Sequence, residues 1–204
     1  MNPPGAETPS VGQATGHTGP LRAMHWATVA LLLATYPAAW AIANATTSAE
    51  AAWLTMLHRS LGLAILALTM VRLTWRRRSS VPPLPADLPA VQRLAARGSV
   101  VAFYALLMLQ PLLGLTASLL HGDRITVFGG VVIPLVLPVD RPYARLVFQV
   151  HGGVALLLLA LIGLHVAAAL YHHFVRRDEV LSTMLPAVRR LSSPDKPGLT
   201  EVPR

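Results

Sequence analysis

Residues 150–173 read VHGGVALLLLALIGLHVAAALYHH. This stretch is apolar over a length that lets a helix cross a membrane. It nevertheless contains four histidines, His151, His165, His172 and His173. Titratable rings are costly inside lipid and usually mark a function there. The spacing of these histidines therefore bears on both the fold and the function of the chain.

The composition is that of a membrane protein. The chain has 204 residues, of which 53% are hydrophobic and 13% charged, with a mean hydropathy of +0.52. Soluble domains carry about a quarter charged residues. The net charge of +8 does not indicate nucleic acid, because the basic residues flank apolar runs, as they do at the cytoplasmic ends of membrane helices. We therefore expect a lipid bilayer as a partner and no nucleic acid.

The sequence contains no cysteine. This excludes disulfides, thiolate zinc sites, iron–sulfur clusters and covalent haem attachment through a C-x-x-C-H motif. Metal chemistry in this chain must use histidine, methionine or carboxylate side chains.

Four apolar runs are long enough to cross a hydrocarbon core about 30 Å thick. They cover residues 24–43, 56–75, 99–120 and 148–175. We predict an all-α membrane protein with one domain, a four-helix transmembrane bundle at residues 21–185. Residues 1–20 are rich in Pro, Gly, Thr and Ala and predict a disordered tail, and residues 186–204 predict a flexible cytoplasmic tail.

Two segments allow another interpretation. The first run is followed by Ala43 and Ala45, which resemble a signal-peptide cleavage site, but its membrane length and the long tail before it favour a retained helix. Residues 125–139 are apolar yet interrupted by two glycines and two prolines. We expect them to form a loop or a half-buried segment packed on the bundle.

Arginine placement predicts the topology. Basic residues follow the second and fourth runs, at Arg76, Arg77, Arg78, Arg93, Arg97, Arg176, Arg177, Arg189, Arg190 and Lys196. The loop at 44–55 has none, and the loop at 121–147 has three arginines beside two aspartates. By the positive-inside rule, both termini and the central loop face the cytoplasm.

With that topology the histidines separate by depth. His25 begins the first helix on the cytoplasmic side, and His58 begins the second on the outer side. His151 and His165 are fourteen residues apart, which brings their side chains to within about 40° of one face and separates them by roughly 21 Å. Depth therefore predicts two pairs, His25 with His165 and His58 with His151.

Two stacked pairs of histidines in an apolar bundle suit two b-type haems. Haem iron takes two axial ligands, and the macrocycle needs an apolar slot between helices. Small residues beside the predicted ligands, Gly62, Gly152, Gly153 and Ala167–Ala169, would let the flat ring approach the backbone. Arg59 is either a partner of a haem propionate or an arginine that anchors the helix at the membrane interface.

Two competing roles fit the histidines less well than haem ligation. A single histidine in a membrane bundle is usually a hydrogen-bonded interhelical residue, but four histidines sorted by depth into two pairs are not accounted for in that way. Zinc would be short of ligands with two histidines per layer and no cysteine.

Three histidines remain. His172 lies about 20° off the face of His165 and roughly 10 Å further along, at the cytoplasmic rim. It is either an interface residue or a proton-handling group beside a quinone, since histidine titrates near neutral pH. We interpret His173 as an interface residue. His121 is an outer-surface residue, with an outer propionate contact or an electron-entry role as alternatives.

The chain resembles the bacterial cytochromes b561, a four-helix, di-haem family of the inner membrane distinct from the six-helix eukaryotic proteins of similar name. The similar stretches are LRAMHWATVALLL, MLHRSLGLAILALTMVRL with the following PPLP, LQPLLGL, and HGGVALLLLALIGLHVAAALYHHFVRRD, and they cover residues 21 to about 185. Pro111 and Gly114 match the P-x-x-G of the third helix. The chain departs from many members at Ala96, Ser99 and Val100, where they carry histidines that are not ligands.

The resemblance implies b-type haem and electron transfer with quinone as one partner. It assigns the ligand positions to His25, His58, His151 and His165, and a position implicated in the quinone site to His172. Some members oxidise superoxide on the outer side. If this chain is an enzyme, the resemblance therefore implies a quinone-linked oxidoreductase similar to superoxide oxidase.

We therefore predict an inner-membrane cytochrome that passes electrons between an outer one-electron partner and the quinone pool. Arg124, Arg141 and Arg145 would attract an anionic donor such as superoxide to the outer side. Two alternatives remain, a haem-bearing anchor or relay subunit for a separate redox enzyme and a haem-free membrane scaffold. Neighbouring genes would distinguish the relay subunit from the predicted cytochrome. An absorption spectrum would distinguish the haem-free scaffold from it.

Overall fold

Four long helices form the molecule in a computed structural model that describes residues 19–79, 89–134, 136–177, 181 and 184. They are α1 (Gly19–Ala43), α2 (Ser48–Arg78), α3 (Ala90–His121) and α4 (Arg141–Tyr171). A π-helical turn, η1 (His172–Arg176), continues α4, and two short strands, β1 (Ile125–Val127) and β2 (Val131–Ile133), join α3 to α4. Each of the four helices is long and apolar enough to span a membrane. The predicted all-α, four-helix transmembrane class is confirmed.

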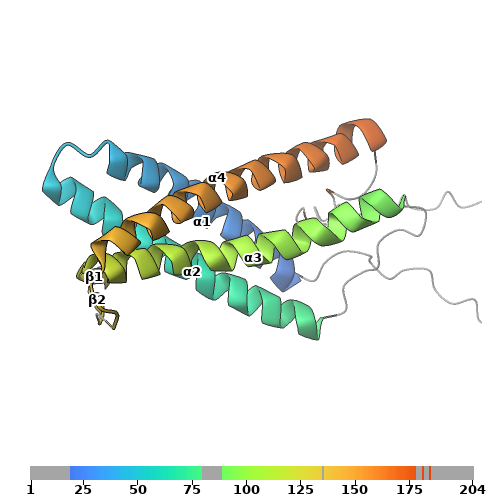
Figure 1. Cartoon of the computed structure of the whole chain (residues 1–204). Helices are drawn as coiled ribbons and strands as arrows, with labels where there is room; N and C mark the ends of the chain where they lie inside the picture. Colours follow the sequence, from blue (N-terminus) through green and yellow to red (C-terminus); the bar gives the residue numbers. More distant parts are fainter. Residues whose placement is uncertain (1–18, 80–88, 135, 178–180, 182–183, 185–204) are drawn as a thin grey trace, which may run out of the picture.

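The helices alternate in direction along the bundle (Figure 1). Neighbours in sequence pack on each other, α1 on α2, α2 on α3 and α3 on α4. The backbones of α1 and α4 make few close contacts, although the Tyr36 hydroxyl donates to the Ala155 carbonyl at 2.8 Å. We call the end that holds the α1–α2 turn and the β1–β2 hairpin the outer end, following the predicted topology, and the opposite end the inner end.

Polar side chains cap the first turns of α2 and α4, which begin before their apolar runs. Thr47 precedes α2, and its hydroxyl accepts from the Glu50 amide at 3.1 Å, while the Glu50 carboxylate accepts from the Thr46 amide at 2.9 Å. Asp140 caps α4 in the same way by accepting from the Tyr143 amide at 3.0 Å. Such caps satisfy the amides that a first turn leaves without helical partners. As a result α2 begins eight residues, and α4 seven residues, before its predicted apolar run.

Residues 125–139 contain the β1–β2 hairpin, where the sequence predicted only a loop or half-buried segment. Ile125 pairs with Ile133 and Val127 with Val131 across the two strands. Ile125 and Val127 are almost fully buried against Leu119 of α3. The Phe128 amide donates to the Ser60 hydroxyl of α2 at 2.8 Å, so the hairpin is fixed to two helices.

The outside of the bundle is apolar. Large side chains such as Leu33, Trp40 and Leu156 are exposed by 69% or more. The buried core is narrow and includes Ile65, Leu107 and Leu158, from three different helices. A surface of this kind suits contact with lipid chains.

Some predictions lie outside the described residues. The tail at 186–204 and residues 1–18 of the predicted N-terminal tail are among them, as is part of the central loop at 80–88. Gly19 and Pro20, the last two residues of that predicted tail, instead begin α1.

Candidate functional site

The structure brings together the four histidines that the sequence paired by depth. The ring centres of His58 and His151 lie 6.3 Å apart near the outer end, with their planes at 80°. The ring centres of His25 and His165 also lie 6.3 Å apart near the inner end, with their planes at 66°. α4 therefore provides one ring of each pair, while α2 provides the outer partner and α1 the inner one.

This separation fits one metal ion between each pair of rings. An imidazole–metal bond is about 2 Å long and the ring centre lies about 1.1 Å behind the nitrogen, so two rings sharing an ion have centres about 6.2 Å apart. Within the described part of the chain, no group of three or more His, Cys, Asp or Glu side chains could hold a metal ion. Two rings without further protein ligands fit haem iron, whose other four ligands come from the macrocycle.

Main-chain carbonyls orient both outer rings. The Nδ1 atom of His58 lies 3.3 Å from the Thr35 carbonyl oxygen, and that of His151 lies 3.0 Å from the Gln110 carbonyl oxygen. A carbonyl only accepts hydrogen bonds, so each ring donates from Nδ1 and keeps the lone pair of Nε2. A metal ligand needs this tautomer. The hydrogen bond of Nδ1 fixes it and leaves Nε2 unprotonated.

The side chain of Gln110 also contacts His151. Its amide nitrogen lies 3.0 Å from the His151 carbonyl oxygen and 3.2 Å from the His151 Nε2 atom. Gln110 therefore holds the backbone of one predicted ligand from the neighbouring helix, and its amide would have to leave Nε2 before that nitrogen could bind a metal. The sequence alone does not identify it, because a single glutamine in an apolar helix does not reveal which face it occupies.

Gly114 makes room for the His151 ring. A Cβ atom at this position would lie 3.0 Å from Cε1 and 3.2 Å from Nδ1 of His151. Contacts this short would force the ring to move. Of the glycines expected beside the haems, Gly62 instead faces Pro111 at 3.8 Å, and Gly152 and Gly153 have open space around them.

Aromatic rings surround the inner pair. Trp26 meets His25 edge to face with ring centres 5.5 Å apart, and Phe103 of α3 meets His165 in the same way at 5.2 Å. The Trp26 indole nitrogen donates to the Met184 carbonyl at 2.8 Å. The inner rings therefore lie in an aromatic setting, to which three helices contribute.

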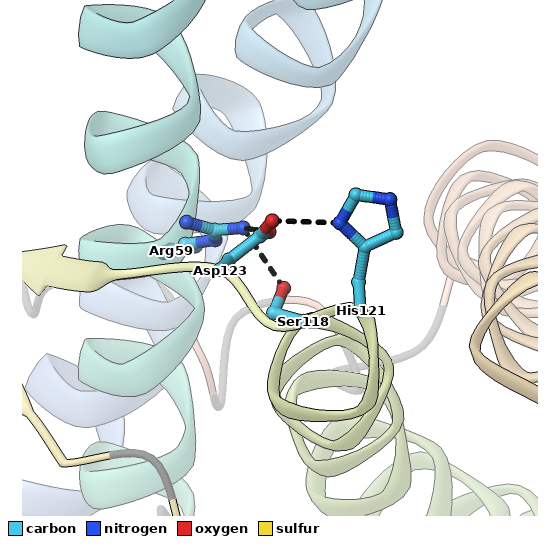
Figure 2. A network of polar contacts seen from close by, with 4 residues as sticks. All are labelled: Arg59, Ser118, His121 and Asp123. Carbon is cyan, nitrogen blue, oxygen red and sulfur yellow. Dashed lines mark hydrogen bonds and ion pairs between the residues drawn. The ribbon is translucent and has the colours of Figure 1, made fainter. Parts of the chain in front are cut away.

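Arg59 lies in a polar network at the outer end (Figure 2). Its guanidinium forms an ion pair with Asp123 and donates to the Ser118 hydroxyl at 3.0 Å. The other carboxylate oxygen of Asp123 lies 2.8 Å from Nδ1 of His121. Neither sequence interpretation of Arg59 included this partner, since Asp123 is 64 residues away in the chain.

His172 and His173 lie in the π-helical turn at the inner end. The amide of His172 donates to the carbonyls of Ala168 and Ala169, where the helix widens. Single π-helical turns occur often at functional sites. His173 is exposed and its ring contacts Phe174, with centres 4.8 Å apart.

Comparison with known proteins finds relatives among membrane cytochromes. The family model described as prokaryotic cytochrome b561 matches residues 16–187. Probable superoxide oxidase CybB of Yersinia pestis is 33% identical over 138 residues, which are 67% of this chain and 77% of that protein. Cytochrome b561 homolog 2 of Escherichia coli (strain K12) is 35% identical over 130 residues, covering 63% of this chain and 69% of the relative.

Cytochrome b561 homolog 1 of the same Escherichia coli strain is 30% identical over 165 residues, covering 80% of this chain and 93% of the relative. The range matched by the family model includes all four spanning helices. The chain therefore belongs to the prokaryotic cytochrome b561 family of bacterial multi-pass membrane proteins, which transfer electrons by means of b-type haem.

Proposed function

We propose that this cytochrome passes electrons between an outer one-electron partner and membrane quinone, and that it holds two b-type haems per chain. His58 and His151 are the proposed axial ligands of the outer haem, and His25 and His165 those of the inner haem. The observation that carries the proposal is the presence of two ring pairs with the same 6.3 Å separation, one toward each end of a membrane-spanning bundle.

Haem supplies reversible one-electron chemistry when bound, and the protein provides binding, orientation and exclusion of water. Ile65 lies seven residues after His58, and Leu158 lies seven residues after His151. Both are buried halfway between the two levels of histidines, together with Leu107. This apolar layer separates the two proposed sites and excludes water between them.

The outer partner has an open groove available. A cavity of about 600 Å³ at the outer end is lined by Arg59, Asp123 and Arg124, with Trp53 and Met56 on its apolar side. We propose an anionic one-electron donor here, with superoxide as the first candidate, because one relative is named a probable superoxide oxidase. Arg124, with Arg141 and Arg145, would attract such a donor.

We place the quinone near His172 at the inner end. A histidine at a widened helix end can exchange protons near neutral pH, which quinone reduction requires. The arginines in the last turns of α2 and η1 support a cytoplasmic inner end and cytoplasmic termini, in the bacterial inner membrane.

Spectra and reduction kinetics of the purified protein test the proposal. We expect b-type absorption bands, two haems per chain, and rapid haem reduction by superoxide or by quinol. Absence of b-type bands would overturn the haem assignment. Two haems that neither superoxide nor quinol reduces would instead favour a relay subunit for a separate redox enzyme.

His172→Ala tests the quinone position, with His173→Ala as its matched control in the same turn. We expect the first variant to slow haem oxidation by quinone severalfold and the second to leave the rate unchanged. Equal rates in both variants would show that quinone does not bind near His172.

A further inference from the structure

Arg72 lies inside the membrane-spanning part of α2, on the same helix face as His58. The two residues are fourteen positions apart, which is the spacing of His151 and His165 on α4. Arg72 therefore lies roughly 21 Å from the level of His58, toward the inner end. Its guanidinium lies over the ring of Tyr104, and Phe103, the residue before Tyr104, meets the His165 ring edge to face. α2 thus brings a cation to the inner histidine pair, where it contributes no histidine.

Three polar atoms at Arg72 and its neighbours form no hydrogen bond with the part of the chain that the structure describes. The Arg72 Nε atom, the Tyr104 hydroxyl and the Thr69 hydroxyl are shielded from solvent and form no hydrogen bond among the residues that the structure describes. Thr69 is one turn before Arg72 on α2 and 2% exposed. The Arg72 guanidinium lies over the Tyr104 ring, 5.8 Å from its centre. Two helices therefore direct three hydrogen-bonding groups to one apolar region.

A partly buried guanidinium inside a membrane span is unfavourable unless an anion pairs with it. The acidic residues of the described ranges are Glu50, Asp123 and Asp140, and all three lie at the outer end. Asp123 is already paired with Arg59. The anion that Arg72 requires is therefore not a carboxylate of the described part of the chain.

We propose that Arg72, with the hydroxyls of Tyr104 and Thr69, binds a propionate carboxylate of the haem held by His25 and His165. The planar fork of a guanidinium matches a carboxylate in two parallel hydrogen bonds, and the hydroxyls supply further donors. Haem carries two such carboxylates on one edge. The inference rests on the proposed function, because it assumes a haem at the inner histidine pair.

The charge of Arg72 also affects the inner haem. A cation near the iron disfavours the oxidised form, which carries one more positive charge. Removing it leaves an unpaired propionate, whose negative charge favours that oxidised form. Arg72→Gln should therefore shift the equilibrium toward oxidised inner haem about tenfold, which lowers its midpoint potential by about 59 mV for one electron.

The test uses the full-length protein with haem, in a redox titration followed by infrared difference spectroscopy. The inner haem is identified as the component that His165→Ala lacks. Growth on 5-aminolevulinate labelled with carbon-13 at C1 labels the propionate carboxylates, so their bands can be recognised. Arg77→Gln, which removes an exposed charge from the same helix, is the matched control.

We expect Arg72→Gln to lower the inner potential and to move the labelled carboxylate bands, while Arg77→Gln changes neither. Tyr104→Phe keeps the ring over the guanidinium and removes only the hydroxyl, so it should move the labelled bands with a smaller change in potential. This variant keeps the inference testable if Arg72→Gln does not fold.

Labelled bands and an inner potential that match the wild type in both Arg72→Gln and Tyr104→Phe would overturn the Arg72 assignment alone. Changes confined to unlabelled bands, accompanied by loss of quinone binding, would also overturn it. Arg72 would then contact quinone and not a propionate. A wild-type protein without the inner haem would overturn both this inference and the proposed function.

Discussion

Each outer histidine ring is oriented by a main-chain carbonyl of a neighbouring helix. Thr35 of α1 and Gln110 of α3 each offer a carbonyl to one Nδ1 atom, so the rings can turn only by breaking a hydrogen bond. Partners of this kind commonly affect metal affinity by about 10- to 100-fold. The outer pair is therefore fixed by main chain, which side-chain substitution does not remove.

Substituting one histidine of each pair tests the pairing. We expect His165→Ala to lower the haem content from two per chain to one and to retain the outer haem, because the rings at the other end are untouched. His151→Ala should remove the outer haem and retain the inner one. The ratio of haem to protein and the reduced spectra measure both. His173→Ala is the control and should keep two haems, and loss of both haems from either ligand variant would argue against independent sites.

Gly114→Ala is a test of the space beside His151. The added methyl group would lie 3.0 Å from Cε1 of the ring, so the ring must move and its hydrogen bond to Gln110 must lengthen. We expect the outer haem to be lost or to change its spectrum, while the inner haem is unaffected.

Gly98→Ala is the matched control on the same helix, because nothing lies within 4 Å of its added Cβ. Both variants should fold, and only the first should alter the haem spectrum. A normal outer haem in Gly114→Ala would show that the ring has room that the structure does not reveal.

Among the secondary-structure elements, the β1–β2 hairpin is held by both α2 and α3. Its strands have three residues each, and an isolated hairpin of that length is unstable in water. Burial of Ile125 and Val127 against α3 and the hydrogen bond to Ser60 of α2 provide the missing stabilisation. The hairpin begins two residues after Asp123, so it helps to hold that carboxylate beside Arg59.

Truncating Ile125 tests this stabilisation. Ile125 is fully buried, and isoleucine-to-alanine changes in packed cores cost about 2–5 kcal/mol. We expect Ile125→Ala to lower the thermal unfolding midpoint in detergent by several degrees. Val132→Ala, on the exposed side of the second strand, should change it little. Equal midpoints for the two variants would show that the hairpin does not stabilise the bundle.

The sequence predicted the helices well because membrane length and apolar composition are local signals. It also predicted which histidines meet, since helical rise converts spacing into depth; their role as haem ligands remains a prediction. It did not predict the strands, because the burial of Ile125 and Val127 depends on tertiary packing against α3 and α2. The Arg59–Asp123 pair and the setting of Arg72 are likewise contacts between segments distant in sequence, which no local pattern encodes.

For the molecule in its membrane, the distribution of arginine predicts the orientation. Reporter fusions can measure this directly. We expect alkaline phosphatase to be inactive when fused after Arg204 and active when fused in the α1–α2 turn near Asn44, because the enzyme matures only outside the cytoplasm. A green fluorescent reporter should show the opposite pattern. Phosphatase activity at the C-terminus would reverse the proposed positions of the quinone and the outer donor.

α4 carries one histidine of each pair, and this has a consequence for biosynthesis. α1 and α2 leave the ribosome first, and each carries only one of the proposed ligands. His151 and His165 are made last, so neither pair is complete until the fourth helix enters the membrane. Haem loading should therefore follow insertion of the whole chain, and a nascent chain arrested after α3 should bind none. Loading of the cofactor would then report that translation has reached the end of the bundle.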